Sequence, residues 1–247
     1  MEKIIEYNDF KIMQYGVLDS TNFEAERIIK NNYYTTSLNN PIIISAMKQS
    51  NSKGTNNRSW HSPVGGLWFS IVFDNNYFFS ETDDNYDDSL LPIFSLAIID
   101  SFKNDKIHIG IKWYNDLIIE NKKFGGLMLT KIFRANKIHT VVGIGINTNN
   151  IVYDQSKMIS FFELTGKKLD NFEILKNIID NSKYFLENIN SRVKLKIYKR
   201  YLMNNISIGE KFKIKNETCI LESINKDYSA NFLDYNMTKV RYCPHEI

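Results

Sequence analysis

The apolar residues of this chain switch between two spacings, and that alternation limits the folds it can adopt. Runs with the length and period of strands occupy 11–18, 41–47, 67–73 and much of 107–147. Helical spacing begins at Thr21 and recurs over 89–103 and 175–189. No apolar run is long enough to cross a bilayer as a helix. Interleaved strands and helices predict an α+β chain with a mixed or antiparallel sheet flanked by helices.

After about residue 206 the apolar residues follow period two. Short strands are predicted at Lys211–Ile214, Cys219–Ser223, Tyr228–Leu233 and Lys239–Tyr242. Several short strands in so few residues favour a small barrel. We therefore predict two domains, a larger one over 1–204 and a small C-terminal β-barrel over 205–247.

Composition narrows the class of protein. The 247 residues include 31 Lys and Arg against 28 Asp and Glu, and the net charge of +3 is too small to indicate a nucleic-acid binder. The two cysteines, Cys219 and Cys243, supply neither a disulfide framework nor a zinc ligand set, which fits a reducing compartment. The N-terminus lacks the pattern of a signal peptide. These features predict a cytoplasmic protein with no membrane partner.

Three polar segments are difficult to explain by packing alone. The first, Asp19-Ser20-Thr21-Asn22, follows a strand and opens a helix. Such residues cap helices routinely, and Thr21 and Glu24 have the spacing of a capping box, so a helix cap is the simpler interpretation. The alternative is a cluster of hydroxyls and an amide that binds a small polar ligand.

The second segment is a polar loop that begins at Gln49 and ends at Trp60, between two buried strands. It is longer than a plain connection needs. A mobile surface loop would explain it. The alternative is a loop that orders over an anion, with Lys53 and Arg58 as cations and Trp60 stacked on a base.

The third segment contains Lys112 and Lys123, each next to apolar residues. A lysine in an apolar strand either extends to solvent or meets an anion, because burial of an unpaired ammonium is costly. In a later strand, Gly143 and Gly145 leave room for a ligand to lie against the backbone. This strand lacks the glycine spacing of a dinucleotide site, and the chain contains no Walker loop.

Taken in this order, the segments resemble the motifs of the biotin protein ligases. That family carries Asp-Ser-Thr-Asn, then a Gln before a Gly-Arg-Gly-Arg loop that ends in Trp and is followed by Ser-Pro-x-Gly-Gly. Its later motifs are Lys-Trp-Pro-Asn-Asp, Lys-x-Gly-Gly and Gly-x-Gly-Ile-Asn. The matching residues here are Asp19–Asn22, Gln49–Gly66, Lys112–Asp116, Lys123–Gly126 and Gly143–Asn147. Two departures stand out, because Tyr114 replaces the proline and the arginine loop reads Ser52-Lys53-Gly54-Thr55.

The resemblance implies an ATP-dependent ligase that forms biotinyl-5′-AMP and passes the biotinyl group to one lysine of a biotin carboxyl carrier domain. It implies a C-terminal barrel of the SH3-like type and three catalytic residues, Lys123, Arg58 and Asp116. Biotin would contact Ser20, Thr21, Asn22, Gln49, Lys53, Gly54, Thr55, Lys123, Gly143 and Gly145. ATP would contact Lys53, Arg58, Trp60, Lys112, Lys123 and Asn147.

The resemblance also implies partners. ATP would act with Mg²⁺ across its phosphates, biotin would be a substrate, and no tightly bound prosthetic group is expected; the sequence assigns no metal ligands. About 18 residues precede Asp19, too few for the helix-turn-helix domain of relatives that also act as repressors, so no nucleic-acid partner is expected. A monomer and a homodimer both stay open.

Two other functions are compatible with the motifs. One is a lipoate or octanoate ligase of the same fold, although Lys112–Asp116 and Trp60 favour biotin. The other is a degenerate module that binds biotin without catalysis, which the altered arginine loop favours and the presence of Lys123, Arg58 and Gln49 disfavours. The small polar residues of that loop predict that it orders only over ligand.

Overall fold

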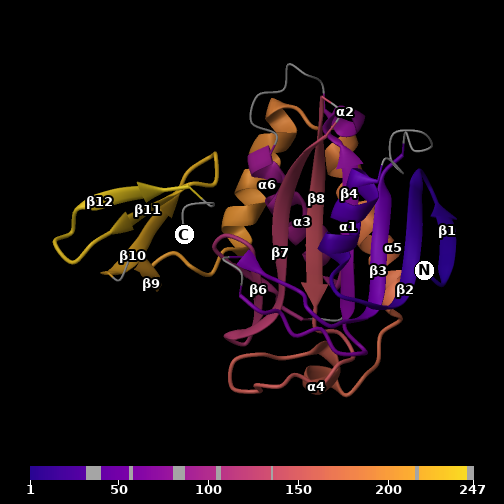
Figure 1. Ribbon diagram of the computed structural model, residues 1–247. Helices are drawn as coiled ribbons and strands as arrows, with labels where there is room; N and C mark the ends of the chain where they lie inside the picture. The colour runs from indigo at the N-terminus through magenta and orange to yellow at the C-terminus, as the bar shows by residue number, and fades with distance from the viewer. Residues whose placement is uncertain are drawn as a thin grey trace. The chain divides into compact units, whose positions relative to one another are not determined.

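The computed structural model describes residues 1–31, 40–55, 58–79, 87–103, 107–134, 136–214 and 217–243 (Figure 1). The chain forms two compact units. Unit 1 combines Met1–Asp83 with Glu120–Asn177, and unit 2 combines Asp84–Ile119 with Ile178–Ile247. The domain boundary between residues 204 and 205 stays a prediction. No helix within the described ranges is long and apolar enough to cross a membrane.

Unit 1 is built on a mixed sheet. Its strands are β1 (Lys3–Tyr7), β2 (Phe10–Leu18), β3 (Ile42–Gln49), β4 (Leu67–Asp74), β7 (Lys122–Arg134) and β8 (Lys137–Ile146). They lie in the order β1-β2-β3-β4-β8-β7, with β2 parallel to β3 and the other neighbours antiparallel. The mixed sheet confirms the predicted fold class, and β1 is an addition that the sequence analysis did not predict.

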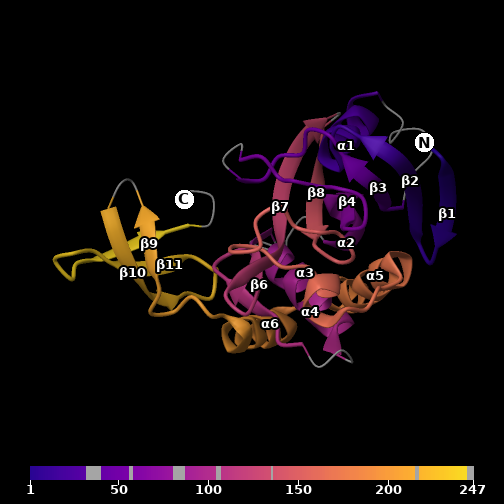
Figure 2. The same cartoon turned by 90° about the horizontal axis from the view of Figure 1, so that it is seen from below.

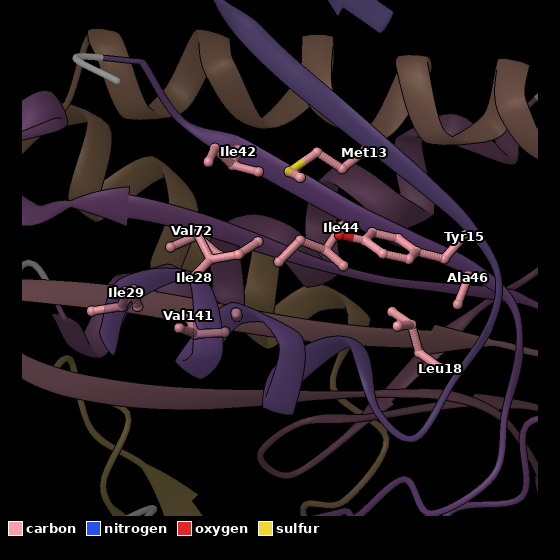
Figure 3. Close-up of a cluster of buried hydrophobic side chains, with 11 residues drawn as sticks. Met13, Tyr15, Leu18, Ile28, Ile29, Ile42, Ile44, Ala46, Val72 and Val141 are labelled. Atoms are coloured by element: carbon pink, nitrogen blue, oxygen red, sulfur yellow. The ribbon is translucent and has the colours of Figure 1, made fainter. Parts of the chain in front are cut away.

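Helix α1 (Thr21–Lys30) packs its apolar side chains on one face of this sheet (Figure 3). Its buried residues recur at helical spacing and meet strand residues that alternate, as side chains on one face of a sheet do. The cluster comprises Met13, Tyr15, Leu18, Ala25, Ile28, Ile29, Ile42, Ile44, Ala46, Val72 and Val141. This packing sets the first turn of α1 beside the end of β3 and the middle of β4. Unit 1 also contains α2 (Asn75–Phe78), α4 (Phe161–Thr165) and the first part of α5 (Asn171–Glu187).

Unit 2 holds the remaining helices and two sets of strands (Figure 2). The helices are α3 (Asp87–Ser101), the end of α5 and α6 (Ser191–Asn204), and a hairpin joins β5 (Gly110–Lys112) to β6 (Asp116–Ile119). An antiparallel sheet follows, made of β9 (Lys211–Ile214), β10 (Glu217–Ile224), β11 (Ala230–Leu233) and β12 (Lys239–Tyr242). Helix α6 was not predicted, because the helical spacing found in the sequence ends at residue 189.

The C-terminal sheet corrects the expectation of a closed SH3-like barrel. Its order is β12-β11-β10-β9, so β9 and β12 are edges within the part of the chain that the structure describes. A barrel closes only when the edge strands pair with each other. The tail is therefore a small antiparallel sheet with two open edges.

Candidate active site

The polar residues at the start of α1 make hydrogen bonds to the neighbouring strands and do not cap the helix with their side chains. The N-cap residue is Ser20, whose side chain makes no capping hydrogen bond to the described backbone, so the predicted capping box at Thr21 and Glu24 is wrong. The backbone N–H of Thr21 donates to Gln49 Oε1 at 2.8 Å, and the Thr21 hydroxyl lies 3.2 Å from the same oxygen. Ser20 and Thr21 are buried. These polar groups therefore point into unit 1.

Sequence reasoning missed Ser70, which extends this cluster on β4. Its hydroxyl lies 2.7 Å from Thr21 Oγ1 and 2.5 Å from Asn22 Oδ1, and its side chain is fully buried. The signal was present in the sequence, because Ser70 is the one polar residue in the run 67–73. A hydroxyl buried in an apolar strand needs a partner. Ser70 has its partners on α1.

A chain of hydrogen bonds continues from Gln49 toward the polar loop. Gln49 Nε2 donates to Ser62 Oγ at 2.8 Å, and Ser62 Oγ lies 2.9 Å from Ser52 Oγ. The Ser52 hydroxyl donates to the carbonyl oxygen of Trp60 at 2.5 Å. The carboxamide of Gln49 therefore connects the first turn of α1 with the loop that ends at Trp60.

The described part of the polar loop forms a hairpin. Lys53 and Ser59 face each other in an antiparallel bridge, and the N–H of Gly54 donates to Arg58 O at 2.8 Å. The N–H of Arg58 donates to Thr55 O at 3.3 Å, and the residues between these two lie outside the described chain. Lys53 and Arg58 are exposed. Both cations therefore stand at the protein surface, where an anionic ligand can reach them.

Lys123 and Trp60, which belong to different motifs, meet at this site. Lys123 Nζ lies 4.9 Å from the centre of the Trp60 ring, within the range of a cation–π contact. The backbone of Lys123 is fixed by hydrogen bonds to Lys157 at 2.8 Å and Ile159 at 3.1 Å. The indole Nε1 of Trp60 is buried and has no hydrogen-bond partner among the described residues. A cation and an aromatic plate therefore stand together at the start of β7.

The space over the two glycines of β8 is used by protein side chains. A Cβ on Gly145 would lie 2.8 Å from Trp60 Nε1, and one on Gly143 would lie 2.5 Å from Asn22 Oδ1. Both distances are too short for real atoms, so glycine is what permits these approaches. The predicted room for a ligand is occupied here, and a ligand on this strand has to share the space with the indole and the amide or displace them.

Asn147 follows β8 and is buried. Its backbone N–H donates to Phe124 O at 2.8 Å, and its carboxamide contacts Lys123 O at 3.5 Å and accepts from Asn150 Nδ2 at 3.1 Å. These contacts hold Asn147 beside the start of β7. They also use part of the hydrogen-bonding capacity with which Asn147 is predicted to contact ATP.

Asp19, which precedes α1, pairs with Arg27 in the second turn of that helix. The guanidinium donates to both carboxylate oxygens, at 2.9 Å and 2.8 Å. This hydrogen bonding lowers the pKa of Asp19 to about 2. Asp19 is therefore an ionised partner of α1, and its backbone carbonyl accepts from Asn51 N at 2.9 Å.

The remaining predicted residues belong to unit 2. Lys112 is exposed at the end of β5, and its Nζ lies 5.6 Å from the centre of the Phe212 ring. Asp116 pairs with Lys112 across the β5–β6 hairpin and is half-buried. Between them, Trp113 is buried and donates from Nε1 to Tyr228 O at 2.9 Å. Four of the five motifs therefore lie in unit 1, and the fifth lies in unit 2.

No group of three or more His, Cys, Asp or Glu side chains suited to a metal occurs within the described ranges. Mg²⁺ keeps much of its water and is commonly held by substrate phosphates with few protein ligands. The residues present are compatible with an ion that arrives as part of MgATP.

Comparison with known proteins supports this picture of the fold. The Aquifex aeolicus structure described as biotin protein ligase in complex with biotin and ATP superposes with a TM-score of 0.67 at 24% identity, covering 93% of this chain and 94% of that one. A Silicibacter structure described as a biotin protein ligase-like protein of unknown function gives a TM-score of 0.73 at 10% identity, covering 98% of both chains. The chain therefore has the biotin protein ligase fold.

Sequence comparison gives relatives and a family. A bifunctional ligase/repressor of Bacillus subtilis is 28% identical over 176 residues, which make up 68% of this chain and 51% of that protein, so the chain spans about half of that relative's length. Biotin–protein ligase 1 of Arabidopsis thaliana is 33% identical over 110 residues, 41% of this chain and 28% of that one. The sequence model of the biotin/lipoate A/B protein ligase family matches residues 17–147, more than half of the chain. The protein therefore belongs to the biotin/lipoate A/B protein ligase family.

Proposed function

We propose that the protein is an ATP-dependent ligase that converts biotin to biotinyl-5′-AMP and transfers the biotinyl group to a lysine of a biotin carboxyl carrier domain. The observation that carries the proposal is the meeting of Lys123 and Trp60 in one unit with the chain of polar groups around Gln49. Relatives described as biotin–protein ligases and the fold of a ligase that binds biotin and ATP support it.

Lys123 is our candidate for the group that neutralises charge in both steps. In the first step a carboxylate oxygen of biotin attacks the α-phosphorus of ATP, a new C(O)–O–P bond forms, and pyrophosphate leaves with the electrons of the broken α–β bond. Both reactants are anionic, so catalysis depends on fixed cations near the reacting oxygens. Lys53 and Arg58 would contact the phosphates from the surface hairpin. Mg²⁺, as part of MgATP, would offset the charge that develops on pyrophosphate.

In the second step the acceptor lysine attacks the acyl carbon. The amide C–N bond forms, the acyl–oxygen bond to AMP breaks, and the attacking amine loses a proton. Asp116 is our candidate to accept that proton, by the place of its motif in the family pattern. Lys112 is a weaker candidate for phosphate contact, because its side chain is exposed and close to Phe212.

The ureido ring of biotin is uncharged and needs neutral donors and acceptors. Gln49 uses Oε1 for Thr21 and one Nε2 hydrogen for Ser62, so its second Nε2 hydrogen is available for a ligand. Ser20, Thr21 and Asn22 would supply the remaining polar contacts. Gly54 and Thr55 would bring the loop over the ring, and Gly143 and Gly145 would lie beneath its apolar part.

ATP would be recognised by stacking and by an amide. Trp60 offers the ring face for adenine, and Asn147 offers a carboxamide beside it, held by its contacts to Lys123 and Asn150. A monomer or a homodimer and a cytoplasmic location stay predictions.

A lipoate or octanoate ligase is the alternative function, because the family to which the chain belongs includes lipoate as well as biotin ligases. The test is release of pyrophosphate from MgATP with biotin, lipoate or octanoate as the acid. Release with biotin alone supports the proposal. Release only with lipoate or octanoate replaces it. Absence of release with every acid, together with a biotin-dependent rise in Tm, identifies a binding module without catalysis.

A further inference from the structure

Ser52 closes the base of the loop hairpin. Its hydroxyl donates to the Trp60 carbonyl at 2.5 Å, and its own carbonyl accepts from the Trp60 N–H at 3.0 Å. The residue is 6% exposed, although its neighbours Asn51 and Lys53 are exposed. Two hydrogen bonds between the same pair of residues define the spacing of the two hairpin strands at this point.

In each hydrogen bond between Gln49, Ser62, Ser52 and Trp60, the identity of the donor can be assigned. A hydroxyl has one hydrogen, and Ser52 uses it on the Trp60 carbonyl, which can only accept. In the Ser52–Ser62 contact of 2.9 Å the donor is therefore Ser62. Ser62 in turn accepts from Gln49 Nε2, which leaves Gln49 Oε1 facing Thr21. The orientation of the Gln49 amide thus depends on the same serine pair that holds Trp60.

We propose that Ser52 is a positioning residue that clasps the hairpin before any ligand binds, and that the clasp fixes Trp60 for ATP. The clasp is defined as the hydrogen bonds of Ser52 to Trp60 and Ser62. The motif quoted in the sequence analysis has glycine at this position, and glycine has no side chain to make two of these bonds. The part that concerns ATP rests on the proposed function.

The clasp would offset part of what the altered arginine loop lacks in charge. Thr55 replaces one arginine of the motif, which removes a cation that would draw the loop over a bound anion. A hairpin that is already closed loses less conformational freedom on binding than an open loop does. The clasp and the prediction that the loop orders only over ligand differ in what they expect of the ligand-free protein, and the first experiment distinguishes them.

The first experiment tests the clasp in the ligand-free protein and does not depend on enzyme activity. Hydrogen exchange is followed in ligand-free wild type, Ser52→Ala and Ser52→Gly, with Ser59→Ala as the matched control because Ser59 lies in the same hairpin with an exposed side chain. The clasp predicts that peptides containing Trp60 exchange about tenfold faster in both Ser52 variants and at the wild-type rate in the control. Wild-type exchange in the Ser52 variants overturns the clasp, whether or not the protein is a ligase.

The second experiment measures positioning. Ser52→Ala should raise the KM for ATP about tenfold, equivalent to about 1.4 kcal/mol, and leave kcat within about twofold. Ser62→Ala removes the contact to Ser52 but leaves the bond from Ser52 to Trp60, so it should raise the KM less. The double variant should cost little more than Ser52→Ala alone, because the Ser52–Ser62 contact is lost in both. An equal fall in kcat, or additive losses, would overturn the positioning role, since general damage to the fold would produce those results.

Discussion

The ammonium of Lys123 lies 4.9 Å from the centre of the Trp60 ring, and this contact joins the residue assigned to the reacting carboxylate with the residue assigned to the base. Neither side chain is fully buried. A charge near the surface can move to meet a phosphate, and the aromatic face stabilises it in the meantime. At the residue scale, the proposed roles of Lys123 and Trp60 are therefore tested by replacing each side chain and measuring adenylate formation and ATP binding.

Lys123→Ala should retain the fold and nearly abolish formation of the adenylate. The loss of one well-placed charge in a transition state costs about 3–4 kcal/mol, roughly a 100- to 1000-fold loss of rate. Exchange of labelled pyrophosphate into ATP measures this step. Lys122→Ala, at the neighbouring position of β7, is the matched control and should stay close to wild type, while Lys112→Ala should cost less than Lys123→Ala.

The Lys123 assignment would be abandoned if the variant kept a rate within threefold of wild type. A larger loss at Lys112 than at Lys123 would reverse the ranking of the two lysines. Near-ultraviolet circular dichroism of each variant separates loss of chemistry from loss of fold.

Trp60→Ala should weaken ATP binding much more than biotin binding. The lost interaction is stacking on the base, worth on the order of 1–3 kcal/mol by analogy with nucleic-acid stacking. Calorimetry with each ligand alone gives the two affinities. Because the indole also packs on Gly145, equal losses for both ligands would instead make Trp60 a structural support of the loop.

At the scale of the elements, Gly143 lets β8 lie close to the side chain of Asn22 in the first turn of α1. Gly143→Ala would place a methyl group 2.5 Å from Asn22 Oδ1, at the movable end of that side chain. We expect the fold to persist, Asn22 to turn away from Ser70, and biotin affinity to fall about tenfold, as for loss of a buried hydrogen bond. Calorimetry with biotin measures the affinity. Unchanged affinity would remove Asn22 from the biotin site.

The start of α1 should show a defined pH response. Arg27 lowers the pKa of Asp19 to about 2, below the value of about 3.9 in an unfolded chain. A lowered pKa means that the folded form binds the proton less well, so the pair stabilises the fold above about pH 4 and this contribution is lost as pH falls toward 2. The Asp19 carboxyl shift in NMR should titrate near pH 2 in wild type and near pH 4 in Arg27→Gln. The same midpoint in both proteins would contradict the assignment.

The main elements of unit 1 were predictable because their signals are local. The apolar runs at 41–47 and 67–73 became β3 and β4, and the helical spacing after Thr21 became α1. The break before α6 was missed because it contains neither Pro nor Gly. Asn190 starts the new helix as its N-cap: its side chain accepts hydrogen bonds from the backbone N–H groups of Arg192 and Val193, at 3.1 Å and 3.0 Å. β1 was missed because its short, largely exposed sequence carries little periodicity.

The motifs of the site were predictable as residues, but their partners were not. Thr21 meets Gln49, which is 28 positions away, and Ser70 lies 49 positions from Thr21. Such pairs form only when α1 packs on β3 and β4, so no local pattern reveals them. Serines such as Ser52 and Ser62 are common in polar loops, and it is their burial that distinguishes these two. The roles of all site residues stay predictions until the variants are measured.

At the scale of the whole molecule, we propose that residues of both units take part in a single two-step reaction. The family match covers residues 17–147, while Lys112 and Asp116 of unit 2 are assigned to ATP and to the acceptor lysine. Transfer to a carrier requires adenylate formation, retention of the intermediate and attack by the acceptor. One assay of transfer therefore tests the claim as a whole.

The most direct measurement is the intact mass of a biotin carboxyl carrier domain after incubation with this protein, biotin and MgATP. The account predicts a gain of one biotinyl group on one lysine, no gain when that lysine is replaced by arginine or when ATP is omitted, and a strongly reduced rate with Lys123→Ala. No mass gain with biotin, alongside modification of a lipoyl domain by lipoate or octanoate under the same conditions, would contradict it.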